Sequence, residues 1–224
     1  MKEKSHNLKF DRIKNLIFDL DGTLIDSSEG VVEATNYALE QMGEPVRPTD
    51  EIVKFIGYPL DKMFAAFSNK SYDEFWKFFQ IRAREAVVGR TIPLDGSDKV
   101  LNELFQRGYR LGIGTTKIRI HIEKIMAKFD WENLIIAYAG ADDVSRVKPD
   151  PEVFNMVLSL MKAEPNETIV VGDTENDVFA ARSAGLAVVG VKSNFGSSEA
   201  LVKSNPDLII NNLGELLTIL KGAV

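Results

Sequence analysis

The sequence Asp19-Leu20-Asp21-Gly22-Thr23 directly follows the short apolar run Leu16-Ile17-Phe18. Such a run is typical of a buried parallel strand, and the glycine favours a turn at the strand's carboxyl end. Asp19 and Asp21 would share one face if the strand continued through them. Two neighbouring carboxylates repel each other unless a cation or a proton offsets their charge. The stretch therefore predicts a divalent metal such as Mg²⁺, which takes oxygen ligands. A strand-end turn with two solvated acids is the alternative.

The composition is that of an ordinary globular protein with a negative charge. Of 224 residues, 45% are apolar and 27% are charged, and the net charge is −6. This charge argues against nucleic acid or an anionic membrane as a partner. The chain has no Cys, so it has no disulfide, no thiolate nucleophile and no Cys-based zinc site. Residues 1–7 lack the apolar segment of a signal peptide, and no apolar run has the length of a membrane span. We expect a soluble, cytoplasmic monomer or homodimer.

The pattern along the chain changes near residue 90. Residues 27–90 predict only helices, over 29–42, up to Gly57, from 59 to 67 and over 72–88. From residue 91 onward, helical segments alternate with short apolar strands at 109–114, 135–139, 168–171, 186–191 and 207–210. This alternation predicts an α/β fold with a doubly wound parallel sheet, covered by helices on both faces.

The economical division of the chain is one sheet domain with an insertion. The sheet domain would comprise residues 8–26 and 91–224, and residues 27–90 would form an all-helical cap inserted after the first strand. Ligands of such sheets bind at the carboxyl ends of the strands. Because the insertion leaves from that edge, it can cover the site.

Three further polar stretches come at the carboxyl ends of expected strands or in the loops beyond them. They are Gly114-Thr115-Thr116-Lys117, Arg146-Val147-Lys148-Pro149-Asp150-Pro151 and Gly172-Asp173-Thr174-Glu175-Asn176-Asp177. Together with Asp19 and Asp21, they would place carboxylates, hydroxyls and a lysine on one rim of the sheet.

These motifs, in this order, resemble those of the haloacid dehalogenase superfamily, specifically phosphoglycolate phosphatase-like members with a helical cap. The resemblance covers roughly residues 14–221. The segment from Asp19 to Thr23 is similar to the first motif of the family, Thr115 to the second, Lys148 to the third and Gly172–Asp177 to the fourth. The resemblance implies a Rossmann-like catalytic core.

The resemblance also implies an Mg²⁺-dependent mechanism. Asp19 would be the nucleophile and form an aspartyl-phosphate, a known use of carboxylates. Asp21 would be the general acid and base. The Asp19 carboxylate, the Asp21 backbone carbonyl and Asp173 would hold Mg²⁺, with Asp177 close by or acting through water.

The implied substrate is a small-molecule phosphate monoester resembling phosphoglycolate. Thr115, Thr116 and Lys148 would bind its phosphate oxygens, where negative charge develops. A β-phosphoglucomutase-like phosphosugar mutase and a pyrophosphatase are the alternatives. A mutase needs cap groups that bind a second phosphate; Arg47, Lys54 and Lys62 could serve, but they form no basic cluster in the sequence of the cap. A receiver-like phosphorylation switch is the non-enzymatic alternative, and the long insertion argues against it.

Several neighbouring residues have simpler interpretations. We expect Lys117 on the surface, His121 away from the rim, and Glu175 in a helical first turn where the helix dipole favours it. The aromatic run Phe75–Phe79 predicts the core of the cap. The segment Phe55–Leu60 is either a specificity loop or a helix-breaking turn.

Overall fold

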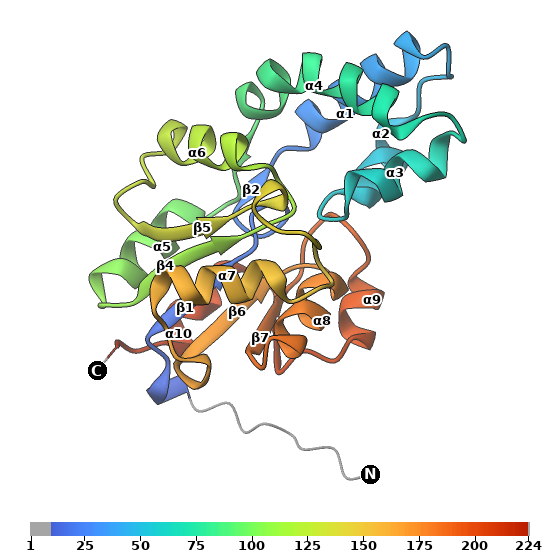
Figure 1. Cartoon of the computed structure of the whole chain (residues 1–224). Helices are drawn as coiled ribbons and strands as arrows, with labels where there is room; N and C mark the ends of the chain where they lie inside the picture. The colour runs from blue at the N-terminus through green and yellow to red at the C-terminus, as the bar shows by residue number, and fades with distance from the viewer. Residues whose placement is uncertain (1–9, 224) are drawn as a thin grey trace.

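Six parallel strands form the central sheet, in the order β5-β4-β1-β6-β7-β8 (Figure 1). The computed structural model describes residues 10–223. The strands are β1 (Asn15–Phe18), β4 (Arg110–Gly114), β5 (Ile135–Ala139), β6 (Thr168–Gly172), β7 (Ala187–Val191) and β8 (Leu208–Ile210). After β1 the chain forms β4 and β5 on one side of β1, and then β6, β7 and β8 on the other side. The predicted doubly wound parallel sheet is confirmed, and β1 lies where the strand order reverses, a position where such sheets bind ligands.

The strands are apolar because both faces of the sheet are covered. In β1, Leu16 and Phe18 belong to one buried cluster, and Ile17 belongs to the other. The first cluster is closed by α5 (Ser97–Gln106), α6 (Arg119–Lys128) and α10 (Leu216–Ile219). The second is closed by α7 (Glu152–Met161), α8 (Glu175–Ser183) and α9 (Ser198–Lys203). Burial on both faces explains why these strands read as continuous apolar runs.

A separate group of helices lies beyond the carboxyl edge of the sheet, at the upper right of Figure 1. This helical segment contains α1 (Ser28–Gln41), α2 (Thr49–Ile52), α3 (Leu60–Phe67) and α4 (Tyr72–Gly89). It has its own buried cluster, in which Phe75 stacks on Phe64 with ring centroids 4.6 Å apart. The prediction that Phe75 and Phe79 form the core of this segment is confirmed.

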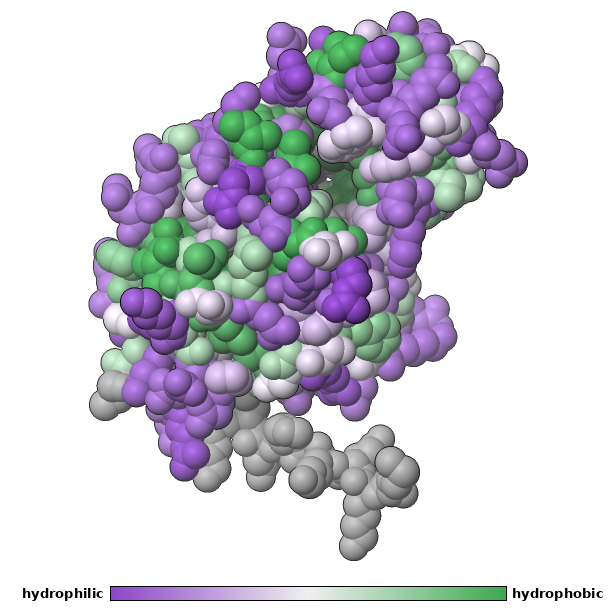
Figure 2. All heavy atoms as spheres, viewed as in Figure 1, coloured by the Kyte–Doolittle hydropathy of each residue, from purple (hydrophilic) through white to green (hydrophobic). Residues whose placement is uncertain are grey.

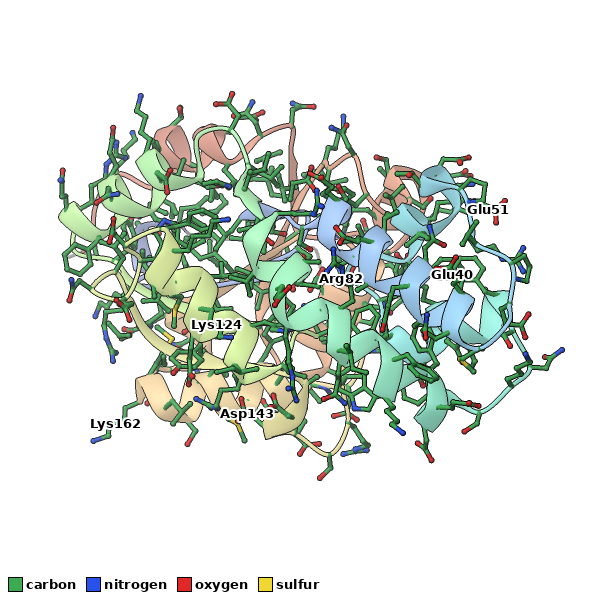
Figure 3. All side chains as sticks on the ribbon, turned by 90° about the horizontal axis from the view of Figure 1, so that it is seen from above. Glu40, Glu51, Arg82, Lys124, Asp143 and Lys162 are labelled. Atoms are coloured by element: carbon green, nitrogen blue, oxygen red, sulfur yellow. The ribbon has the colours of Figure 1, made fainter. Side chains whose placement is uncertain are left out.

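Helices α1 and α4 run side by side, as the view from above in Figure 3 shows. Gly30 permits this close approach, since a Cβ atom there would come 2.4 Å from the backbone oxygen of Ala86. At the edge of the same interface, Arg82 of α4 pairs with Glu33 of α1.

Two elements of secondary structure differ from the sequence-based expectation. Strands β2 (Ile25–Asp26) and β3 (Ile92–Pro93) form a small antiparallel ladder where the chain enters and leaves the helical segment. Two residues are too few to show the period of a strand, so no pattern predicted this ladder. The helix expected over 213–221 is a 3₁₀ turn, Leu213–Glu215, followed by the short α10.

Within residues 10–223, every helix is too short or too polar to cross a membrane. The expectation about residues 1–7 lies outside the described part of the chain.

Candidate active site

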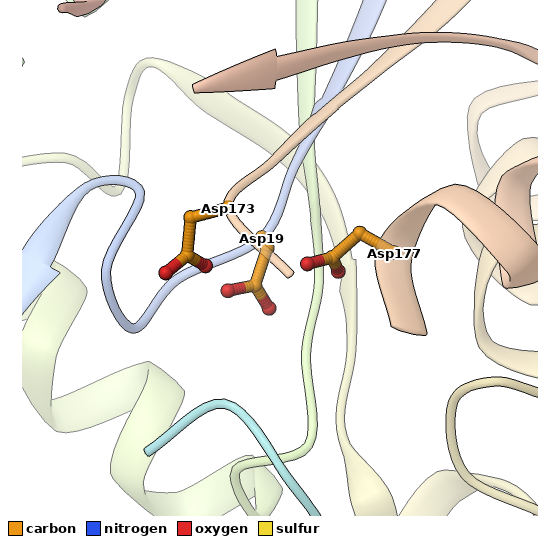
Figure 4. A group of neighbouring side chains, drawn as sticks. All are labelled: Asp19, Asp173 and Asp177. Carbon is orange, nitrogen blue, oxygen red and sulfur yellow. The ribbon is translucent and has the colours of Figure 1, made fainter. Parts of the chain in front are cut away.

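Three aspartates converge at the carboxyl ends of β1 and β6. Asp19 follows β1, Asp173 follows β6 and Asp177 lies in the first turn of α8. All three are buried, and one carboxylate oxygen of each lies within 4.8 Å of the others. Figure 4 shows the three carboxyl groups side by side. Asp19 Oδ2 is buried and has no hydrogen-bond partner among residues 10–223. Clustered carboxylates with an unpaired oxygen suit a hard divalent cation.

Local geometry brings Asp19 and Asp173 together through Gly22. This glycine has φ +79°, a conformation that side chains rarely adopt. A Cβ atom at this position would lie 2.1 Å from Asp173 Oδ2. The predicted turn at Gly22 is present, and its lack of a side chain also makes room for the second aspartate.

Hydrogen bonds orient the other two carboxylates. The Ser193 hydroxyl donates to Asp173 Oδ2 at 2.7 Å. The Thr174 backbone N–H and hydroxyl both donate to Asp177 Oδ2, at 3.0 and 2.7 Å. Asp177 is thereby fixed by the amino end of its own helix, an arrangement that helix termini favour. Sequence reasoning missed Ser193, because its loop after β7 carries no recognisable motif.

Lys148 reaches the cluster from the loop before α7, and its side chain is only 1% exposed. Its ammonium donates to Asp19 Oδ1 and, at 2.6 Å, to Asp177 Oδ1. Burial lowers the pKa of Lys148, but the neighbouring Asp177 and Asp19 outweigh burial and raise it. Lys148 is therefore a permanent cation that contacts two of the three carboxylates.

One ammonium does not balance three buried carboxylates. Burial, only partly offset by Lys148, raises the pKa of Asp19 to about 7. Burial, with the charges of Asp19 and Asp177, raises the pKa of Asp173 well above its ordinary value. The site therefore has an excess of negative charge that a divalent cation would neutralise.

Asp21 is not a member of the group of three aspartates, and it lines a cavity. Its Oδ1 accepts a hydrogen bond from Ser27 and lies 3.1 Å from the ammonium of Lys117. The Lys117 side chain is only 9% exposed, so the prediction that it lies on the surface is wrong. The loop after β4 turns Lys117 toward Asp21, and their opposite charges allow the partial burial of both. Its position two residues after Thr115 was the signal that could have identified it.

The two threonines of the second motif have different surroundings. Thr115 is buried at the end of β4, where its hydroxyl accepts a hydrogen bond from the Lys117 N–H at 3.3 Å. Thr116 lines the cavity. Their contact with phosphate remains a prediction.

The cavity has a volume of about 370 Å³ and lies between the helical segment and the sheet domain. The segment Phe55–Leu60 lines it over its whole length, which favours the specificity-loop interpretation. His121 also lines it, so the expectation that this residue lies away from the rim is wrong. Helix α6 begins just after β4, and its first turn therefore faces the rim. Burial lowers the pKa of His121 to about 4.

Comparisons with known proteins agree on one family. The family model for haloacid dehalogenase-like hydrolases matches residues 16–191. Pyrophosphatase PpaX of Bacillus velezensis is 31% identical over 214 residues, covering 93% of this chain and 96% of that protein. The crystal structure of a haloacid dehalogenase-like hydrolase from Bacteroides fragilis has a TM-score of 0.86 and 29% identity, covering 91% of this chain and 99% of that one. That of a predicted phosphoglycolate phosphatase from Haemophilus somnus has a TM-score of 0.81 and 27% identity, covering 93% and 98%.

Proposed function

This chain belongs to the haloacid dehalogenase-like hydrolases, as its motifs predicted, and we propose that it is an Mg²⁺-dependent phosphatase of small-molecule phosphate monoesters. The observation that carries the proposal is the buried group of Asp19, Asp173 and Asp177, with Asp19 Oδ2 unpaired and Oδ1 held by Lys148. The names of its relatives, phosphatases and a pyrophosphatase, support the same reaction class.

The metal would be held by the carboxylates of Asp19, Asp173 and Asp177 and by the backbone carbonyl of Asp21. When bound, Mg²⁺ would reduce the repulsion between the anionic phosphate and the anionic nucleophile.

Asp19 would attack phosphorus while the bond from phosphorus to the leaving oxygen breaks, producing an aspartyl-phosphate and an alcohol. Asp21 would give its proton to the leaving oxygen. It would then take a proton from the water that hydrolyses the aspartyl-phosphate, so that inorganic phosphate leaves and Asp19 is regenerated. Lys148 would hold Asp19 in place, and it would bind phosphate oxygens together with Thr115 and Thr116.

The names of similar proteins make phosphoglycolate and pyrophosphate the first substrates to assay. The phosphosugar mutase has less support from the cap. Arg47 donates to the backbone oxygen of Phe67 inside the helical segment, and Lys54 and Lys62 are exposed on its surface. The cavity lining includes none of these three cations.

Phosphate release tests this proposal. We expect release with Mg²⁺ from at least one member of a panel of phosphoglycolate, pyrophosphate, sugar phosphates and nucleotides, and loss of release with chelator. Asp19→Asn should lower turnover about 10³-fold or more while keeping the fold, whereas the exposed Asp95→Asn should match wild type. Substantial activity in Asp19→Asn would remove it from the nucleophile role. Conversion of β-glucose 1-phosphate to glucose 6-phosphate without phosphate release would favour the mutase.

A further inference from the structure

We propose that the physiological substrate carries an uncharged, largely apolar leaving group. This inference rests on the proposed phosphatase function, because it concerns the part of the substrate beyond the phosphate. It differs from phosphoglycolate and pyrophosphate, whose leaving groups are anionic.

The cavity adjoins the proposed phosphate site. Thr116 and Val147 line the cavity. In the sequence, Thr116 directly follows Thr115, and Val147 directly precedes Lys148. Asp21, the proposed acid for the leaving oxygen, lines it as well. A phosphate bound near Asp19 would therefore direct its ester group into this space. In Figure 2 the surface is hollowed between the helical segment and the rest of the molecule, and hydrophobic side chains are visible inside.

Apolar side chains line both walls of the cavity. The helical segment contributes Phe55, Leu60, Met63, Trp76 and Phe79, and the sheet domain contributes Ile118 and Val147. Trp76 and Phe79 are stacked, with an interplanar angle of 15° and centroids 6.0 Å apart. The volume of about 370 Å³ is within the range of small-molecule sites. Such a wall stabilises an apolar group by removing its surface from water.

The charges in the cavity disfavour an anionic leaving group. Among the described lining residues, the charged side chains are Asp21, Lys117 and Asp61. Lys117 lies 3.1 Å from Asp21, and the other charged side chain, Asp61, is negative, so the lining has no net positive charge whether Asp21 carries its proton or not. His121 is neutral at pH 7, since burial lowers its pKa to about 4. A carboxylate or a second phosphate would lose water here without a net positive charge in the lining to offset that loss.

The nearest alternative for an anion is a second cavity of about 260 Å³, lined by Arg84 and Lys124 together with Trp76, Phe79 and His121. Lys124 is labelled on α6 in Figure 3, and both cations are exposed. A substrate that used them would need an apolar linker and a charged far end. An ester of 6-hydroxyhexanoate tests this possibility.

The experiment compares esters matched in size but not in polarity. Cyclohexylmethyl phosphate and glucose 6-phosphate both join a six-membered ring to phosphate through a primary carbon. We expect kcat/KM with Mg²⁺ to favour cyclohexylmethyl phosphate by about 10²-fold, since the four hydroxyl groups of glucose 6-phosphate would lose water among apolar side chains. We expect it to exceed that of phosphoglycolate and pyrophosphate by at least about 10-fold. The kcat/KM for hexyl phosphate should also exceed that for the phosphate ester of 6-hydroxyhexanoate. Equal or reversed preferences in either matched pair overturn the inference.

Variants at two positions test the lining directly. Trp76→Ala should lower kcat/KM for cyclohexylmethyl phosphate about 10-fold and Trp76→Phe should largely restore it. Asp61→Asn, at an exposed position, should raise kcat/KM for phosphoglycolate more than that for cyclohexylmethyl phosphate. If neither Trp76→Ala nor Asp61→Asn changes the ratio of kcat/KM for these two substrates, the inference is contradicted.

Calorimetric binding to Asp19→Asn separates this inference from the proposed function. The ratio of affinities for cyclohexylmethyl phosphate and glucose 6-phosphate decides the leaving group without requiring turnover. If wild type releases phosphate from no substrate while the apolar ester still binds more tightly, the phosphatase proposal fails and the apolar preference stands. If wild type releases phosphate but the apolar ester does not bind more tightly, the phosphatase proposal stands and the inference of an apolar leaving group fails.

Discussion

The hydroxyl of Tyr58, in the helical segment, donates a hydrogen bond to the carboxylate of Glu175, in the first turn of α8, at 2.8 Å. Burial and this hydrogen bond raise the pKa of Tyr58, so it stays a neutral donor. Glu175 lies between Asp173 and Asp177 in the sequence, and the contact therefore joins the helical segment to the part of the chain that carries two of the three clustered aspartates. Glu175 therefore does more than interact favourably with the dipole of α8.

We predict that this contact holds the helical segment over the site. Tyr58→Phe and Glu175→Gln should each lower kcat/KM several-fold, and a double-mutant cycle on kcat/KM should give a coupling of about 1 kcal/mol. Tyr72→Phe is the matched control, since Tyr72 lines the same cavity. Additive effects of the two variants would show that the contact does not contribute to closure.

We predict that the stability of chelator-treated protein depends on pH through Asp19. Burial raises its pKa from 3.8 to about 7, so the folded state binds more protons than the unfolded state between those values. The stabilisation from this group is complete below pH 3.8 and is lost as the pH rises through about 7. Thermal unfolding in EDTA should show the Tm of wild type falling relative to that of Asp19→Asn over this range.

Mg²⁺ should oppose the fall in the Tm of wild type with rising pH, because it binds the ionised carboxylates. Its stabilising effect on wild type should grow from pH 5 to pH 8. Asp95→Asn should follow wild type in both conditions. Parallel curves for wild type and Asp19→Asn would mean that Asp19 titrates normally in the folded protein.

We predict that Gly22 is needed for the cluster itself and not only for its turn. Gly22→Ala would place a methyl group 2.1 Å from Asp173 Oδ2, in addition to the strain of φ +79°. Gly96→Ala is the control, since it has φ +82° and no atom within 4 Å of its added Cβ. Gly96→Ala should cost about 1–2 kcal/mol of stability and keep activity. Gly22→Ala should cost more and weaken Mg²⁺ binding, measured by calorimetry. Equal losses in the two variants would contradict this.

We predict that Lys148→Met destabilises the protein through unpaired charge. It would leave the buried carboxylates of Asp19 and Asp177 without their cation, at a cost of about 3–5 kcal/mol in EDTA. Added Mg²⁺ should offset part of this loss, and substrate binding should weaken more than metal binding. The exposed Lys99→Met serves as control. A collapse of Mg²⁺ affinity with unchanged substrate affinity would assign Lys148 to the metal instead.

Much of the architecture followed from patterns that act over a few residues. Buried parallel strands must be apolar on both faces, and β5 was predicted at the same residues that the structure shows, Ile135–Ala139. Parallel strands end at one edge of the sheet, so motifs after different strands were expected to meet there. Asp19, Asp173, Asp177 and Lys148 do meet, although the chain separates Asp19 from Lys148 by 129 residues.

The sequence by itself determined the alternation of strands and helices, the helical insertion and the residues available at the rim. Only the tertiary structure decided which lysine contacts which aspartate, with Lys148 on Asp19 and Lys117 on Asp21. It also decided that His121 faces the cavity and that apolar side chains from the helical segment line it. The physical reason is the range of the interactions. Backbone pattern and turns depend on near neighbours, whereas the direction of a side chain depends on how distant elements pack.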